Sequence, residues 1–115
     1  MKSLKFLLLP IAMIFFVSCK KDIASNIPDC IRREIKSHGK NWEICGVDEY
    51  LFQNKLVYAF SPDGEIIADG STAIIDENCS QICSVGGFGG PQVNLCNSEN
   101  FFQSAVLKRN IWMKK

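Results

Sequence analysis

Hydrophobic positions divide the chain into one continuous apolar segment at the N-terminus and a longer region of short, interrupted apolar runs. The continuous segment is Phe6–Val17, 12 residues with only Pro10 as an interruption. A helix that crosses a bilayer needs roughly 20 apolar residues, so this segment is too short to span one. Behind the positive charges of Lys2 and Lys5, it is typical of a secretory signal. We therefore predict a signal peptide over residues 1–18.

The first periodic segment of the remaining chain predicts a helix of about two turns. Ile31 and Ile35 recur at the i, i+4 spacing that places side chains on one helix face. Asp29 is a candidate N-cap, because a carboxylate can accept the free N–H groups of a first turn. Gly39 can end the helix in the left-handed conformation. So short a helix needs a surface to dock on.

Beyond Cys45 the runs become β-branched and aromatic, which predicts strands. Residues 47–60 form a hairpin that is interrupted at 53–55, and the turn chemistry of Ser61–Gly64 follows. Further strands are predicted at 65–68, 72–75 and 81–83, which makes four or five in an antiparallel meander. Strand alternation places Tyr58 and Phe60 on the inner face and residues 57 and 59 on the outer face.

The C-terminal region carries two signals. Asn97 or Ser98 can cap a helix whose apolar stripe is Phe101, Phe102, Ala105 and Val106. Residues 111–113 fit either a last edge strand or a tucked tail, and the periodicity does not choose between them.

Composition and charge restrict the class of protein. The chain has 115 residues, of which 47% are hydrophobic and 22% are charged, with a net charge of +1. This balance predicts a single folded domain and gives no basic excess for binding nucleic acid. Loss of residues 1–18 would remove Lys2 and Lys5 from the 13 basic residues and leave 11 basic against 12 acidic ones. Attraction to a membrane by net charge is therefore not expected.

The end of the apolar segment suggests a lipid anchor. The sequence Phe16-Val17-Ser18-Cys19 resembles the lipobox of bacterial lipoproteins, in which the signal is cut before a cysteine that becomes lipidated. An ordinary signal peptide with a nearby cysteine, or an apolar N-terminal helix, is the alternative. With Cys19 as the anchor, we expect a lipidated tether at 19–28 and a globular domain at 29–115. Several acyl chains would hold such a domain stably on a membrane.

Five cysteines remain after Cys19, and an odd number allows at most two disulfides. The candidates are Cys30, Cys45, Cys79, Cys83 and Cys96, for which 15 two-bridge patterns exist. Cys83 with Cys96 would close a glycine-rich loop. Cys30 would then pair with Cys45 or with Cys79. Disulfides of this kind commonly stabilise small exported domains.

Metal binding and catalysis have weaker support. Cys79, Cys83 and Cys96 with His38 could form a Cys3His zinc site, but no CxxC pair accompanies them and an oxidising compartment disfavours it. The acidic residues Asp63, Asp69 and Asp76 lie in separate turns without the spacing of a calcium loop. His38 is the sole histidine and lies at a helix end, where an exposed imidazole is expected. We predict no metal, no cofactor and no catalytic residue.

The glycine-rich loop has two interpretations. It lacks the GK[ST] sequence that phosphate-binding loops carry, which favours a structural loop beside a disulfide. An exposed Phe88 at its tip would instead make it a recognition loop. That loop comprises Gly86, Gly87, Phe88, Gly89 and Gly90.

Several motifs together resemble a known family. They are the Asp29-Cys30-Ile31 start, the strand at 56–60, the segment Ile75-Asp76-Glu77-Asn78-Cys79-Ser80-Gln81-Ile82-Cys83, the Gly86-Gly87 pair, Cys96, and the closing Ile111-Trp112. The pattern is similar to a domain of unknown function in small Cys-rich lipoproteins of the Bacteroidota, over about residues 29–113. Members often carry an adjacent Cys-Cys pair upstream of the DENC segment, which this chain lacks. The resemblance implies no activity.

Together these patterns predict a small α+β domain with a disulfide-stapled antiparallel sheet of four or five short strands and one or two short helices. We expect a non-enzymatic envelope lipoprotein, most simply on the outer membrane, that binds an envelope protein or a glycan. Its orientation toward the periplasm or the cell surface stays open. The alternative is a small hydrolase inhibitor that presents the loop Gly86–Gly90.

Overall fold

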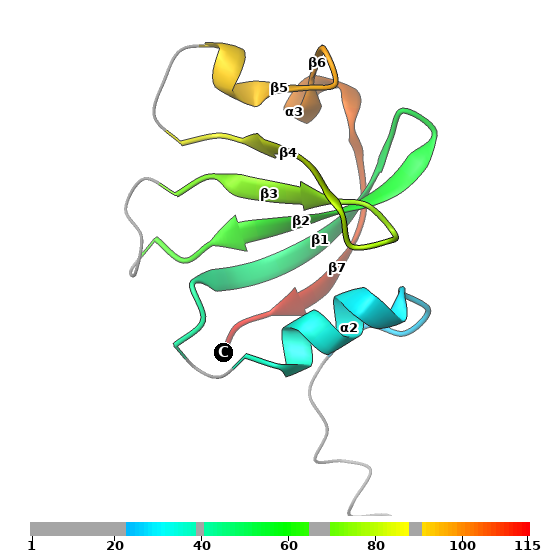
Figure 1. The fold of residues 1–115 in the computed structure, drawn as a ribbon, viewed down its shortest axis with the longest axis vertical. Coiled ribbons are helices and arrows are strands. Elements are labelled where there is room, and N and C mark those ends of the chain that lie inside the picture. Colours follow the sequence, from blue (N-terminus) through cyan, green and yellow to red (C-terminus); the bar gives the residue numbers. More distant parts are fainter. Residues whose placement is uncertain (1–22, 39–40, 65–69, 88–90) are drawn as a thin grey trace, which may run out of the picture.

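The computed structural model describes residues 23–38, 41–64, 70–87 and 91–115. Its centre is a five-stranded antiparallel sheet with the strand order β4-β3-β2-β1-β7, accompanied by a second sheet of β5 and β6 (Figure 1). Within these ranges, two short helices, α2 (Asp29–Lys36) and α3 (Phe101–Ser104), complete the domain. The predicted small α+β class with an antiparallel sheet and two disulfides is therefore confirmed.

Helix α2 spans Asp29–Lys36 and packs through Ile31 and Ile35, both of which are fully buried. The capping prediction for Asp29 is wrong, because Asp29 is the first helical residue and Pro28 occupies the cap position without a side-chain hydrogen bond. The Pro28 carbonyl accepts the first backbone N–H bonds of the helix. The helix ends at Lys36, and Gly39 lies outside the described residues.

The predicted hairpin is present as β1 (Ile44–Phe52) and β2 (Lys55–Pro62). Its two-residue turn is Gln53–Asn54, with φ angles of 51° and 66°. Positive φ at both positions is typical of a type I′ turn, whose twist matches that of the flanking strands. Strands β3 (Thr72–Ile75) and β4 (Gln81–Val85) extend the meander. The strand predicted at 65–68 lies outside the described residues.

The sheet is covered on both faces, which corrects the prediction of an outer face at residues 57 and 59. Tyr58 and Phe60 belong to a first core under α2. Val57 and Ala59 belong to a second core, with Phe101 of α3, and are no more than 3% exposed. The side chains of β2 do alternate between the two faces of the sheet, but a second covering layer buries the face that was expected to meet solvent.

That second layer comes from the C-terminal third of the chain. A 3-10 turn η2 (Pro91–Asn94) leads into the strands β5 (Leu95–Cys96) and β6 (Glu99–Asn100), which the helical turn α3 (Phe101–Ser104) follows. The helix predicted from Asn97 or Ser98 onward is wrong in extent, because those two residues form the β5–β6 turn and the Asn100 side chain accepts the N–H of Gln103 as the cap of α3.

Strand β7 (Val106–Met113) resolves the alternative at the C-terminus in favour of an edge strand. It pairs antiparallel with β1, so Val106 belongs to a strand and not to the predicted helix. Backbone pairing with β1 outweighs the weak helical periodicity of residues 101–106, since a helix so short gains little from its own hydrogen bonds.

The segment before α2 packs against the domain. Ile27 is buried, and Ile23 and Ala24 contact the first core. The Ala24 N–H donates to the Ile111 carbonyl at 2.9 Å. Residues 23–28, predicted as part of the lipidated tether, are therefore attached to the sheet, whereas residues 19–22 lie outside the described part of the chain.

Candidate functional site

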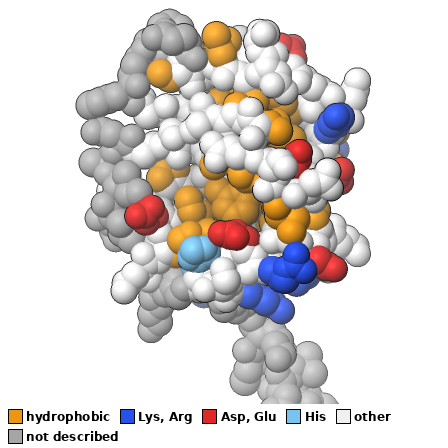
Figure 2. Space-filling view, in the orientation of Figure 1, with side chains coloured by type: hydrophobic (Ala, Val, Ile, Leu, Met, Phe, Trp, Pro, Cys, Tyr) orange, Lys and Arg blue, Asp and Glu red, His pale blue; other side chains and the backbone are white. Residues whose placement is uncertain are grey.

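A groove lies between α2 and the sheet in the described structure. Its volume is about 340 Å³ and it is open to solvent on one side. Figure 2 shows it as a hollow of hydrophobic atoms with the histidine and an acidic side chain at its rim. We call this surface the α2 groove; it is lined by Ile31, Glu34, Trp42, Ile44, Phe60, Ala73, Ile75, Cys79 and Gln81.

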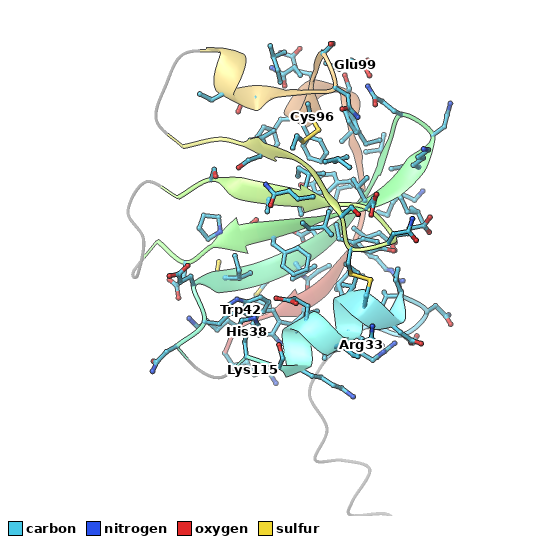
Figure 3. The ribbon with its side chains drawn as sticks, viewed as in Figure 1. Arg33, His38, Trp42, Cys96, Glu99 and Lys115 are labelled. Atoms are coloured by element: carbon cyan, nitrogen blue, oxygen red, sulfur yellow. A yellow bond between two sulfur atoms is a disulfide. The ribbon has the colours of Figure 1, made fainter. Side chains whose placement is uncertain are left out.

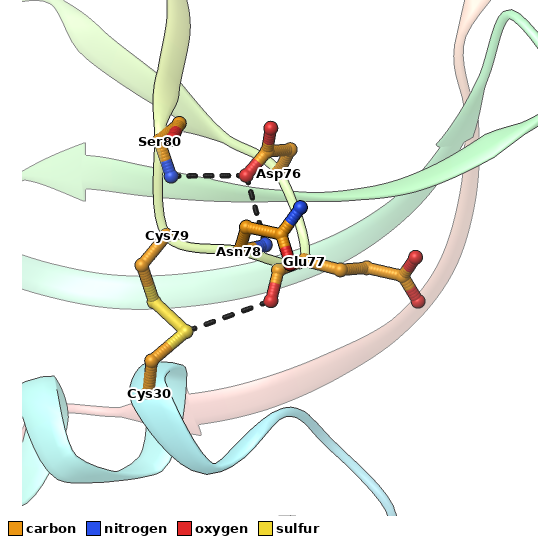
Figure 4. The surroundings of a disulfide bond; sticks show 6 residues. All are labelled: Cys30, Asp76, Glu77, Asn78, Cys79 and Ser80. Carbon is orange, nitrogen blue, oxygen red and sulfur yellow. Dashed lines mark hydrogen bonds between the residues drawn. A yellow bond between two sulfur atoms is a disulfide. The ribbon is translucent and has the colours of Figure 1, made fainter.

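A disulfide forms one end of the α2 groove. Cys30 in α2 is joined to Cys79 in the β3–β4 turn, with the Cα atoms 6.1 Å apart (Figure 4). The carboxylate of Asp76 organises this turn, since its Oδ1 accepts the backbone N–H groups of Asn78 and Ser80, both at 2.9 Å. Cys79 itself has a φ of 65°. The turn therefore presents Cys79 to the helix, and Asp76 has the structural role expected of a turn carboxylate.

Aromatic side chains form the opposite end. The rings of His38 and Trp42 stack with centroids 4.2 Å apart and an interplanar angle of 1°, and Figure 3 shows the two side by side beyond α2. Trp42 also contacts Phe60 and Trp112, at centroid distances of 6.1 and 5.4 Å. Lys114 supports this end because its Nζ donates to the Trp42 carbonyl at 2.7 Å. Trp42 is thereby held in place as a wall of the groove.

Polar chemistry in the α2 groove is limited to a few groups. Glu34 reaches its edge, and its Oε2 lies 3.0 Å from His38 Nε2. Gln81 contributes an exposed amide. Cys79 is the one lining residue of a nucleophilic type, and its sulfur is bonded to Cys30. The lining thus offers apolar contact with one carboxylate and one amide, which suits binding.

A buried polar network lies elsewhere on the same face and was missed by the sequence reasoning. Glu49 on β1 is directly opposite Tyr58 on β2 and Arg109 on β7. The Tyr58 hydroxyl donates to Glu49 Oε2 at 2.9 Å, and Arg109 Nε donates to Oε1 at 3.0 Å. Burial, followed by the hydrogen bond and the charge of Glu49, raises the pKa of Tyr58 above its ordinary range.

This network has a structural task. Arg109 Nη2 also donates to the Asn26 carbonyl at 3.0 Å, so it ties the segment before α2 to the sheet. The signal that could have found it is Glu49 itself, a charged residue on the same strand face as the inward-facing Val47. A carboxylate on that face requires a cation or donors from neighbouring strands.

The glycine-rich loop begins as the sequence suggested. Cys83 is bonded to Cys96, and the Gly86 N–H donates to the Val93 carbonyl at 3.0 Å. Gly86 and Gly87 have φ angles of 87° and 86°, a conformation that residues with a side chain rarely adopt. Phe88, Gly89 and Gly90 lie outside the described residues, so the recognition tip stays a prediction.

The remaining candidates stay apart from the groove lining. Cys45 is a free, half-buried thiol whose Sγ lies 3.3 Å from the Pro62 carbonyl oxygen. Across the described ranges, no group of three or more His, Cys, Asp or Glu side chains is arranged to hold a metal ion. Within those ranges, no helix is long and apolar enough to cross a membrane. Cys19 lies outside them, so its lipidation stays a prediction.

Comparison with known proteins identifies the family. A family model described as a domain of unknown function, DUF6970, matches residues 33–114. No curated protein and no solved structure matches the chain. Because the match covers most of the sequence, the chain belongs to the DUF6970 family.

Proposed function

We propose that this member of the family is a non-enzymatic binding module of the bacterial cell envelope, attached to a membrane through lipidated Cys19. Two features of the sequence support the anchor: the short apolar signal over residues 6–17 and the lipobox-like Phe16-Val17-Ser18-Cys19. The two disulfides agree with export to an oxidising compartment. We propose that the protein is attached to the outer membrane.

The observation that carries the binding role is the α2 groove. Side chains from four strands line it, among them Ile44, Phe60 and Ala73, and a helix pinned by a disulfide forms its wall. Preformed apolar grooves with a few polar groups are typical ligand-binding surfaces. Cys79 is held by its disulfide to Cys30, and Trp42 is held by its ring contacts and by Lys114. These two ends of the groove are therefore fixed without a ligand.

The lining favours a protein partner over a glycan. A sugar presents many hydroxyl groups and needs several polar partners, whereas Glu34 and Gln81 are the charged or amide side chains of the groove. The ring of Trp42 is already stacked on His38, which occupies one face that a sugar could use. We therefore propose that the groove takes an apolar side chain or short apolar segment of an envelope protein.

Site-specific photocrosslinking in cells tests this function. A photoreactive amino acid replaces the exposed Gln81 at the groove, and in a matched variant it replaces the exposed Lys55 at the β1–β2 turn. We expect one defined protein adduct from position 81 and none from position 55. Ala73→Trp, which fills the groove, should abolish the adduct while both disulfides still form. Equal crosslinking from both positions would refute the groove as the binding surface.

The anchor requires a separate test. Cells supplied with an alkyne fatty acid should yield a labelled wild-type protein in the membrane fraction, and Cys19→Ser should remove the label. A wild-type protein that carries no label would contradict the anchor and would leave the groove hypothesis untouched.

A further inference from the structure

The segment before α2 is attached to the sheet, although its sequence predicts a tether. Ile23 and Ala24 pack on the same core as Ile31 and Ile35 of α2. The hydrogen bond from Ala24 to Ile111 and that from Arg109 to Asn26 add two polar ties. The domain is therefore held from Ile23 onward, and a link to Cys19 would begin there.

The length of that link limits how far the domain can move from a membrane. Four residue steps separate Cys19 from Ile23. A fully extended chain spans at most about 3.6 Å per residue, so the two Cα atoms lie within about 14 Å of each other. A lipidated Cys19 would thus place the surface around Ile23 and α2 close to the lipid headgroups.

The outer face of α2, defined here as Arg32, Arg33 and Lys36, is basic. The exposed Asp29 at the start of the helix lies on the same face and leaves it a net charge of +2. Arg33 and Lys36 are exposed and Arg32 is half-buried. Among the described residues, none of the three forms an ion pair. Figure 2 shows basic side chains gathered at this end of the molecule, and Figure 3 labels Arg33 there. By contrast, Lys114 is paired with Asp63 at 2.8 Å.

We propose that the short link from Cys19 holds the outer face of α2 against the membrane surface, where its charges contact anionic lipid headgroups. The inference rests on the proposed lipid anchor. The near-neutral total charge of the processed chain does not oppose it, because charges more than about 8–10 Å apart are largely screened at physiological salt. Only the basic side chains next to the membrane then contribute to the attraction.

Lysine accessibility in the intact lipoprotein tests the orientation. The acylated protein, residues 19–115, is placed in vesicles of phosphatidylglycerol and phosphatidylcholine, or in neutral detergent, and is treated with a membrane-impermeant acetylating reagent. Mass spectrometry then gives a modification rate for each lysine. We expect Lys36 to react at least about threefold more slowly in the vesicles, as headgroups screen it and attract its charge. Lys55, exposed at the distant β1–β2 turn, is the internal control and should react equally in both.

Two variations of the experiment test whether the short link and the anionic lipid cause the protection of Lys36. A flexible spacer of 20 Gly and Ser residues between Asp22 and Ile23 extends the mean reach by about 25 Å and should abolish the protection of Lys36. Vesicles of phosphatidylcholine alone should reduce the protection. Equal slowing of Lys36 and Lys55, or full protection with the spacer, would overturn the orientation. A purified protein without acyl groups would instead refute the proposed anchor, so the two failures are distinguishable.

Discussion

Removal of the Cys30–Cys79 disulfide should destabilise the domain more than removal of Cys83–Cys96. The first pair is separated by 49 positions and the second by 13. In the chain-entropy account, a disulfide stabilises by restricting the unfolded chain, and the effect grows with the logarithm of loop length. These loops correspond to about 4 and about 3 kcal/mol, a difference of about 1 kcal/mol.

The size of the effect is large for a domain of this length. Total stabilities of small domains are typically about 5–15 kcal/mol, so loss of about 4 kcal/mol removes a quarter or more of the total. The burial of Ile31 and Ile35 still holds α2 on the sheet. We therefore expect a folded protein in which the wall of the α2 groove has lost its covalent tie to the β3–β4 turn.

Urea unfolding, followed by circular dichroism, measures these losses. The variants are the double replacements Cys30→Ser with Cys79→Ser and Cys83→Ser with Cys96→Ser, so that no unpaired thiol is created. Cys45→Ser is the control because that thiol forms no bridge, and we expect it to cost less than about 1 kcal/mol. The reasoning would be refuted if the Cys30–Cys79 variant were the more stable of the two double variants, or matched the Cys45 control.

Three further predictions concern the tyrosines and the glycine loop. Tyr58→Phe leaves the buried Glu49 without one donor and should lower the free energy of unfolding, measured in urea, by about 1–3 kcal/mol. The hydroxyl of Tyr50 has no described hydrogen bond, so Tyr50→Phe should cost less, and equal losses would contradict the network. Burial raises the pKa of Tyr58 in the folded state, so the folded protein favours the neutral hydroxyl. The free energy of unfolding should therefore fall as pH rises above about 10, where the unfolded chain loses this proton. A Tyr58→Phe variant that loses the same stability at high pH would exclude this cause. Gly86→Ala should lower the stability by about 1–2 kcal/mol because of the φ of 87°, although a Cβ added there would meet no atom within 4 Å. Gly64→Ala should be nearly neutral, and equal thermal midpoints for the two variants would refute this.

Local patterns were sufficient for the elements that carry strong local signals. The β-branched and aromatic run from Val47 to Phe60 predicted the hairpin, and Ile31 with Ile35 predicted the buried face of α2. The β5–β6 pair was missed because its strands have two residues each, too few for a period to show. Its turn, Asn97–Ser98, also lacks the glycine that usually marks a type I′ turn.

The α2 groove could not be predicted from local sequence patterns, for a different reason. The α2 groove exists because α2 meets the β3–β4 turn, a contact between segments 49 positions apart. Among 15 bridge patterns the sequence did not select one, so the docking of α2 was undetermined. Trp42 likewise becomes a wall only through contacts with His38 and Trp112, which no spacing reveals. The resemblance to a family of unknown function agreed with the match to DUF6970 but added no site.

The intact mass of the protein extracted from membranes, with free thiols alkylated and no reductant added, tests the account most directly. We predict the mass of residues 19–115 plus acyl groups, less four hydrogens for the two disulfides, with one alkylated thiol at Cys45. A chain that is cleaved but carries no acyl group would contradict the anchor. A mass without the loss of four hydrogens would contradict the stapled domain on which the α2 groove depends.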